Sequence, residues 1–123
     1  MARYMALLYY PAQRYWTEPV EGQFAPGYRE FAQDATAADV LRGGEPLHPV
    51  GTATTITVAD AEGGELMITD GPYAEATEVL GGYYFLEVAD LDEAIGWAAK
   101  IPAAWRGRVE IRPVVAGGGT LPP

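Results

Sequence analysis

The sequence predicts an α+β fold, in which an antiparallel sheet carries two helices on one face. Three observations lead to it: segments rich in β-branched and aromatic residues, two stretches with apolar residues every three or four positions, and the order in which these segments alternate. At 123 residues, the chain has the usual size of one domain. We expect a single domain over residues 1–114 and a mobile C-terminal tail over residues 115–123.

The first half of the chain predicts a strand followed by a helix. Residues 3–10, RYMALLYY, are rich in strand-forming side chains and stop at Pro11, so we expect a buried strand in the middle of the sheet. From Tyr28 to Leu41, apolar residues recur at spacings of three and four, which predicts an amphipathic helix. Gly43 and Gly44 follow and suit its C-terminal cap.

The next segments predict a hairpin and a strand. Residues 52–60 and 65–69, TATTITVAD and ELMIT, are rich in strand formers, and the turn AEGG between them predicts a β-hairpin. Residues 82–88, GYYFLEV, predict a further strand. Because side chains alternate along a strand, Tyr83 and Phe85 fall on one side of it.

The last helix and strand are predicted from DLDEAIGWAAKIP and RVEIRPV. Asp90 and Glu93 have the spacing of a capping box, and Pro102 ends the helix. Glu110 lies on the outer side of the final strand, beside the candidate residue Arg112. The residues expected to face the core are Leu91, Ala94, Ile95 and Ala98 in the helix and Val109 and Ile111 in the strand.

The order strand, helix, hairpin, strand, helix, strand resembles a ferredoxin-like α+β sandwich. Helices on one face of its antiparallel sheet leave the other face open. On that face, Tyr83 and Phe85 are too apolar to stay in contact with water. We therefore expect a homodimer that closes two such sheets face to face.

Composition excludes several classes of function. Without cysteine, the chain has no disulfide, no thiolate nucleophile and no thiolate zinc site, and with one histidine we expect no metal site. A net charge of −9 disfavours direct binding to nucleic acid and to anionic membranes. No apolar run approaches the roughly 20 residues that span a bilayer. We expect a cytoplasmic protein, and because no cofactor motif is present we expect no cofactor.

The segment LMITDGPYAEATEVLGGYYFLEVADLDEAIGWAAKIPAAWRGRVEIRPV, residues 66–114, resembles the signature half of the DGPF group within the YCII-related domain family. The opening RYMALLYY and the segment LRGGEPLHP match the same pattern. The resemblance covers nearly the whole chain apart from the loop around residues 11–26 and the tail. Its specificity lies in the combination of the DGP turn, the Gly-Gly-Tyr-Tyr strand start and the Glu-Ile-Arg-Pro ending.

The resemblance implies a dimeric α/β barrel of the ferredoxin-like class, a cytoplasmic location and a function that is mostly unassigned. The wider family carries a histidine near the start of the first helix and a later aspartate, a pair that implies an enzyme. Here Tyr28 stands at the histidine position and AAKIPAAW contains no acid, so this pair is absent. Some relatives are described as transcription-initiation proteins or lie beside alternative sigma factors, which implies a second kind of role.

Asp70, His48 and Glu75 are the candidate catalytic residues. Asp70, on a turn, can act as a general base or bind a ligand, and it can equally cap its own turn. Glu75 can share acid and base roles with Asp70, or it can favour the N-terminus of a short helical turn that starts at Pro72. Histidine is the side chain whose ordinary pKa lies closest to neutral pH, so His48 can carry a proton, and the alternative is a surface residue between two prolines.

Tyr73, Tyr83, Arg112 and Tyr28 are the candidate ligand-binding residues. Tyr73 covers the DGP turn or contacts a ligand, and Tyr83 lines the space between two sheets, as packing or as part of a cavity. Arg112 can bind a substrate carboxylate, or it can pair with a carboxylate across the dimer. Tyr28 is included because it stands where the family resemblance implies a histidine.

Two hypotheses for the function follow. In the first, a homodimer binds a small molecule in a cleft beside the DGP turn, with Asp70 as base or anchor and His48 or Glu75 as its proton partner. In the second, the chain is a regulatory or interaction module linked to transcription initiation, whose acidic surface meets a basic protein partner such as a sigma factor.

Overall fold

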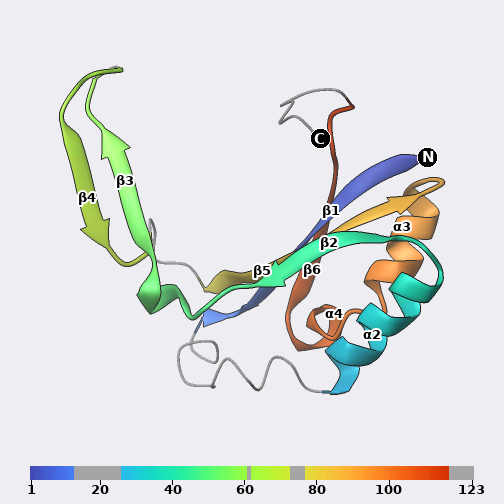
Figure 1. The fold of residues 1–123 in the computed structure, drawn as a ribbon. Helices are drawn as coiled ribbons and strands as arrows, with labels where there is room; N and C mark the ends of the chain where they lie inside the picture. The colour runs from blue at the N-terminus through green and yellow to red at the C-terminus, as the bar shows by residue number, and fades with distance from the viewer. Residues whose placement is uncertain (13–25, 61, 73–76, 117–123) are drawn as a thin grey trace.

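The computed structural model describes residues 1–12, 26–60, 62–72 and 77–116, and it has the predicted α+β architecture with an antiparallel sheet (Figure 1). Of the candidate residues, Tyr73 and Glu75 lie outside this described part, as does most of the predicted tail. The elements in chain order are β1 (Ala2–Pro11), α2 (Pro26–Ala37), β2 (Leu41–Pro46), the short 3₁₀ helix η2 (Val50–Thr52), β3 (Thr54–Val58), β4 (Leu66–Asp70), β5 (Glu78–Val88), α3 (Leu91–Ala98), α4 (Ala103–Arg106) and β6 (Arg108–Pro113).

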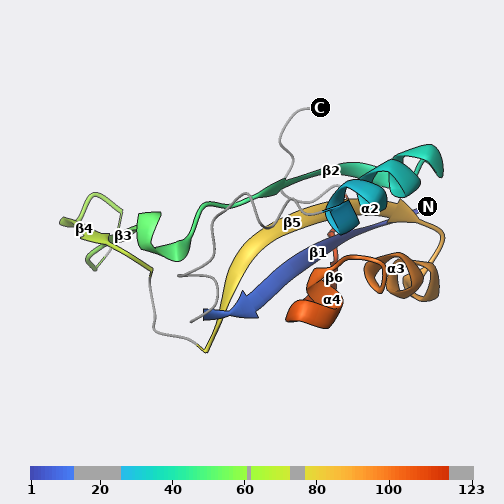
Figure 2. The same cartoon turned by 90° about the horizontal axis from the view of Figure 1, so that it is seen from below.

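The main sheet has four strands in the order β2-β5-β1-β6, and each neighbouring pair is antiparallel. The prediction that the first strand lies inside the sheet is confirmed, because β1 pairs with both β5 and β6. Helices α2, α3 and α4 lie on one side of this sheet (Figure 2). Among the helices that the structure describes, none is long and apolar enough to cross a bilayer.

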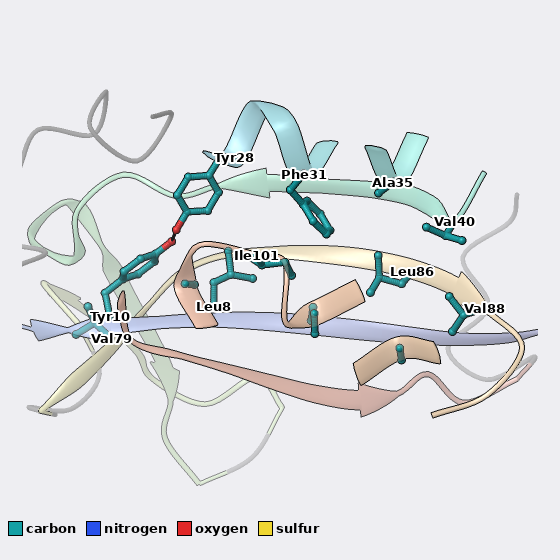
Figure 3. Close-up of a cluster of buried hydrophobic side chains, with 14 residues drawn as sticks. Leu8, Tyr10, Tyr28, Phe31, Ala35, Val40, Val79, Leu86, Val88 and Ile101 are labelled. Carbon is teal, nitrogen blue, oxygen red and sulfur yellow. Dashed lines mark hydrogen bonds between the residues drawn. The ribbon is translucent and has the colours of Figure 1, made fainter. Parts of the chain in front are cut away.

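The hydrophobic core fills the space between these helices and the sheet (Figure 3). Alternation along the strands selects its members, since every second side chain points toward the helices in β1 and, on each side of the register shift between Leu80 and Gly82, in β5. Of the apolar positions predicted to form the stripe of the first helix, Tyr28, Phe31 and Ala35 are buried, whereas Ala38 is exposed. The core residues are Ala6, Leu8, Tyr10, Tyr28, Phe31, Ala35, Val40, Val79, Leu86, Val88, Ala94, Ala98, Ile101 and Ala103.

The first helix ends at Ala37, so its predicted extension to Leu41 and its predicted cap at Gly43 and Gly44 were wrong. Asp39 ends the helix instead, with a left-handed φ of 61°. The amide of Val40 donates to the carbonyl of Ala35, and that of Asp39 donates to Thr36, each at 3.0 Å. These two bonds are those of a Schellman cap. The cap was missed because aspartate, rather than glycine, occupies its left-handed position.

Substitutions at Asp39 test this cap. We expect Asp39→Gly to raise the free energy of unfolding by about 0.5 kcal/mol and Asp39→Ala to lower it by about 1 kcal/mol, because only glycine adopts the left-handed conformation without a Cβ penalty. Urea denaturation followed by circular dichroism measures both. A lower stability of Asp39→Gly would contradict the cap.

Residues 41–46 form β2, which provides the fourth strand of the sheet. The predicted hairpin does form, with Ile56 opposite Ile68, but β3 and β4 make a separate two-stranded sheet. The predicted hairpin is therefore confirmed, and it stands apart from the main sheet. Once the hairpin is set aside, the remaining elements follow the order β-α-β-β-α-β, with the short α4 before the last strand.

The capping box predicted at the start of α3 is confirmed. The amide of Glu93 donates to Asp90 Oδ1 at 2.9 Å, and Glu93 Oε2 accepts a hydrogen bond from the amide of Ala89 at 3.1 Å. Asp90 has extended backbone angles, as an N-cap residue does. The two side chains satisfy amides that have no partner inside the helix.

The apolar stripe predicted for α3 was only half right. Ala94 and Ala98 are buried, whereas Leu91 and Ile95 are about half exposed. The buried side continues instead into Ile101, which is fully buried just beyond the helix. A helix of 3.6 residues per turn places these alanines and Ile101 on one line, and it turns Leu91 and Ile95 toward its flank.

Candidate functional site

A cavity of about 120 Å³ lies between the start of α2 and the strands β1, β2 and β5. We call it the tyrosine pocket. Its wall is mainly apolar and combines phenol rings with glycine backbone. The residues that line it are Leu8, Tyr10, Tyr28, Gly44, Glu45, Pro46, Gly81, Gly82, Tyr83 and Tyr84.

The hydroxyl groups of Tyr10 and Tyr28 are hydrogen-bonded to each other (Figure 3). Tyr10 comes from β1, where it alternates with Leu8 on the side toward the helices. Tyr28 comes from the first turn of α2. Both side chains are buried, so this part of the cavity wall offers polar hydroxyl oxygens within an otherwise apolar surface.

Tyr84 adds a third phenol to the pocket. Its ring packs against Phe31, with ring centroids 4.9 Å apart. Burial raises the pKa of the Tyr84 phenol above its ordinary value, and the neighbouring Tyr10 adds to the rise. Tyr84 therefore keeps its proton at neutral pH, which suits it to hydrogen bonding and not to work as a base.

Glycines make the opposite wall of the pocket because β2 and β5 approach too closely for side chains. A Cβ added at Gly44 would lie 2.4 Å from the carbonyl oxygen of Tyr83, and the φ of Gly44 is +149°. A Cβ added at Gly82 would lie 3.1 Å from the carbonyl oxygen of Glu45. The Gly-Gly pairs of this sequence thus bring two strands together beside the cavity.

The candidate residues do not come together in one site. Tyr28 and Tyr83 line the tyrosine pocket, whereas Asp70, His48 and Arg112 do not. Asp70 is exposed at the end of β4, and His48 is exposed between β2 and η2. Tyr10 and Tyr84 were not among the candidates, although their positions in predicted strands were the signal that could have identified them.

The DGP turn closes the base of the hairpin. The amide of Gly71, whose φ is +101°, donates to the carbonyl of Ala53 at 2.7 Å. The hydroxyl of Thr55 donates to the carbonyl of Gly71 at 2.9 Å. Within the described residues, the Asp70 carboxylate makes no hydrogen bond or ion pair. The backbone of Gly71 therefore holds the turn, and the carboxylate of Asp70 faces outward.

Side chains that point away from the helices form a second surface, which we call the open face. Residues directly opposite each other on neighbouring strands share a face of the sheet. The ring centroids of Tyr83 and Phe85 lie 5.7 Å apart, and the guanidinium of Arg3 lies 5.7 Å from the Phe85 ring. The open face has three rows: Glu45, Tyr83, Leu7 and Glu110; Gly43, Phe85, Met5 and Arg112; and Glu87 with Arg3.

Charges are arranged unevenly over the open face. The first row carries two carboxylates, Glu45 and Glu110, at its two ends. The third row carries Arg3 and, through an ion pair of 3.1 Å to Glu87, the guanidinium of Arg42. The middle row between them carries Phe85 and Met5 and, at one end, Arg112. Among the described residues, no group of histidine and acidic side chains is suited to hold a metal ion.

Comparison with known proteins gives two results. The chain is 37% identical over 73 residues to an uncharacterised protein of Rhizobium meliloti (strain 1021), an alignment that covers 55% of this chain and 59% of that protein. The chain thus spans less than two thirds of the length of this relative. The sequence model of the YCII-related domain matches residues 2–116. Because this match includes nearly every described element, the chain belongs to the YCII-related domain family.

Proposed function

We propose that the protein is a homodimer, built as a ferredoxin-like dimeric α/β barrel, that binds a small uncharged molecule in the tyrosine pocket. The observation that carries the binding proposal is the pocket itself, an apolar cavity with hydroxyl groups in its wall. Such a combination is typical of small-molecule sites, where a few polar groups orient a mainly apolar ligand.

The open face supports the dimer. Its centre holds Leu7, Met5, Tyr83 and Phe85, which are only half-buried in a single chain. A two-fold axis through the middle row would place the acidic first row of one copy over the arginine-bearing third row of the other. The first row of one copy is therefore complementary in charge to the arginines of the third row of the other.

The pocket's chemistry indicates the class of ligand. Its volume of about 120 Å³ compares with the roughly 150 Å³ of an engineered cavity in another protein that binds benzene. The chain carries a net charge of −9, so anionic ligands are repelled. We infer a ligand about the size of benzene that carries a hydroxyl or carbonyl group.

We propose binding, without acid/base catalysis, as the role of this pocket. Asp70 and His48 do not line it. Tyr84, which does line it, holds its proton more tightly than an ordinary tyrosine. Neither observation supplies the pocket with a group that exchanges protons near neutral pH.

Titration with phenol, followed by amide chemical shifts, tests the binding proposal. We expect saturable shifts at Gly44, Gly81 and Gly82 and a dissociation constant of about 1 mM or lower. Benzoate, which has a similar size and a negative charge, should leave these shifts unchanged. If phenol produces no saturable shift at these glycines, the pocket is a packing void, and the interaction-module hypothesis takes the place of ligand binding.

Removing one hydroxyl group from the pocket tests how the ligand is held. We expect Tyr28→Phe to weaken phenol binding about fivefold, because it removes a hydrogen-bonding group worth about 1 kcal/mol from the cavity wall. Tyr4→Phe is the matched control, since Tyr4 is a half-buried tyrosine of β1 that does not line the pocket. Equal phenol affinity in the two variants would contradict a role for the Tyr28 hydroxyl.

A further inference from the structure

The β3–β4 hairpin exposes a continuous apolar surface. Ile56 is opposite Ile68, and Val58 is opposite Leu66, so all four side chains share one side of the hairpin. We call these four residues the hairpin face. They are 63%, 61%, 45% and 58% exposed respectively. The other side of the hairpin carries Thr55, Thr57, Met67 and Thr69.

This alternation of apolar residues mainly with threonines is typical of a two-stranded sheet in which one side is buried. Strands that are solvated on one side place apolar residues on the covered side and polar residues on the wet side. An isolated two-stranded hairpin is only marginally stable in water. The described hydrogen bond at its base, from Gly71 to Ala53, closes the hairpin itself and does not join it to the main sheet. The hairpin face therefore lacks its cover within the described residues.

The hairpin stands beside the open face of the main sheet. In Figure 1, it rises from one end of the sheet on the side opposite helices α2, α3 and α4. Figure 2 shows the same hairpin beyond the end of the sheet, away from the helices. A second copy seated on the open face would therefore lie next to the hairpin.

Charge also favours a second copy of this chain as the partner of the hairpin face. Asp70 alternates with Ile68 along β4, so its exposed carboxylate lies at the base of the hairpin face. The open face carries Arg3 and Arg112, both exposed. A second copy of the chain would thus offer apolar side chains and arginines to a surface that has apolar side chains and one carboxylate.

We infer that the hairpin is an arm that packs its apolar face, the hairpin face, against a second copy of this chain. The inference rests on the proposed homodimer. In that dimer each copy is held twice, once through its open face and once by the arm of its partner, and Asp70 is brought to the junction of the two copies.

Single cysteines test the arm directly, because the chain has none of its own. Ile68→Cys places a thiol on the hairpin face, and Met67→Cys places one on the opposite side as the matched control. The two positions are adjacent, and both side chains are exposed in a single chain. We expect N-ethylmaleimide to modify the thiol of Ile68→Cys at least tenfold more slowly than that of Met67→Cys at concentrations where the protein is dimeric.

Repeating the measurement with both cysteine variants in protein that also carries Phe85→Arg distinguishes an error in the arm proposal from an error in the dimer proposal. Phe85→Arg, which disrupts the open face, should make the protein monomeric and bring the two reaction rates together. Equal rates in protein that sediments as a dimer overturn the arm and leave the dimer standing. If Ile68→Cys still reacts slowly in the monomer, the arm proposal is also overturned, because the chain then covers its own hairpin. A parent protein that is monomeric overturns both proposals.

Discussion

Gly44→Ala is expected to lower the free energy of unfolding by about 3 kcal/mol or more. The added Cβ would lie 2.4 Å from the Tyr83 carbonyl oxygen and 2.7 Å from the Tyr84 ring, and the φ of +149° is one that side chains rarely adopt. Backbone cannot move aside as the end of a flexible side chain can, so β2 must separate from β5. A strained backbone and a lost strand contact each cost about 1–3 kcal/mol.

Gly96→Ala is the matched control for this measurement. Gly96 lies in α3, is exposed and has nothing within 4 Å of its hypothetical Cβ. The substitution should raise the free energy of unfolding by about 0.5–1 kcal/mol, because alanine is the better helix former. Urea denaturation of the two variants should therefore move the midpoint in opposite directions. An unchanged midpoint for Gly44→Ala would mean that β2 does not pair with β5 as described.

Phe85→Arg is expected to raise the dissociation constant of the dimer at least about 1,000-fold. Phe85 lies in the middle row of the open face, and a two-fold axis through this row would place it against the same row of the partner. Arg3 and Arg112 lie nearby. The change removes a buried aromatic ring, worth about 2 kcal/mol, and sets like charges against each other at a cost of several kcal/mol. The side chain faces away from the core, so the fold should be retained.

Sedimentation over a concentration series measures the effect. Trp105→Arg is the control, since Trp105 is an exposed aromatic residue of α4 on the opposite side of the sheet. We expect that variant to remain as dimeric as the parent protein. A Phe85→Arg variant that still dimerises would place the interface elsewhere, and a monomeric parent would contradict the dimer altogether.

Local patterns were sufficient for the elements whose periodicity is strong. β1 and β5 alternate clearly between buried and outward side chains, and the capping box of α3 consists of two residues three positions apart. β2 has no such pattern, because LRGGEP contains two glycines and a proline. It becomes a strand because it approaches β5 closely at Gly44. This is a tertiary contact, and it produces no alternating pattern of apolar and polar residues in the sequence.

The tyrosine pocket could be predicted only in fragments. Tyr28 was selected through the family resemblance and Tyr83 through strand alternation, but the cavity joins residues from four separate elements. The pairing of Tyr10 with Tyr28 spans 18 positions, and a turn motif such as DGP is far more visible in a sequence than such a pair. This is why the catalytic hypothesis centred on Asp70 while the pocket formed around the phenols.

The position of β1 in the sheet has a consequence for how the chain folds. Among the described strands, β1 pairs only with strands that lie far later in the sequence: Tyr4, for example, is opposite Leu86 on one side and Pro113 on the other. Contacts so distant in sequence make folding slow, on a scale of milliseconds to seconds. Until β5 leaves the ribosome, the apolar segment RYMALLYY has no strand with which to pair. A nascent or truncated chain that stops before β5 is thus the species most exposed to aggregation and to capture by chaperones.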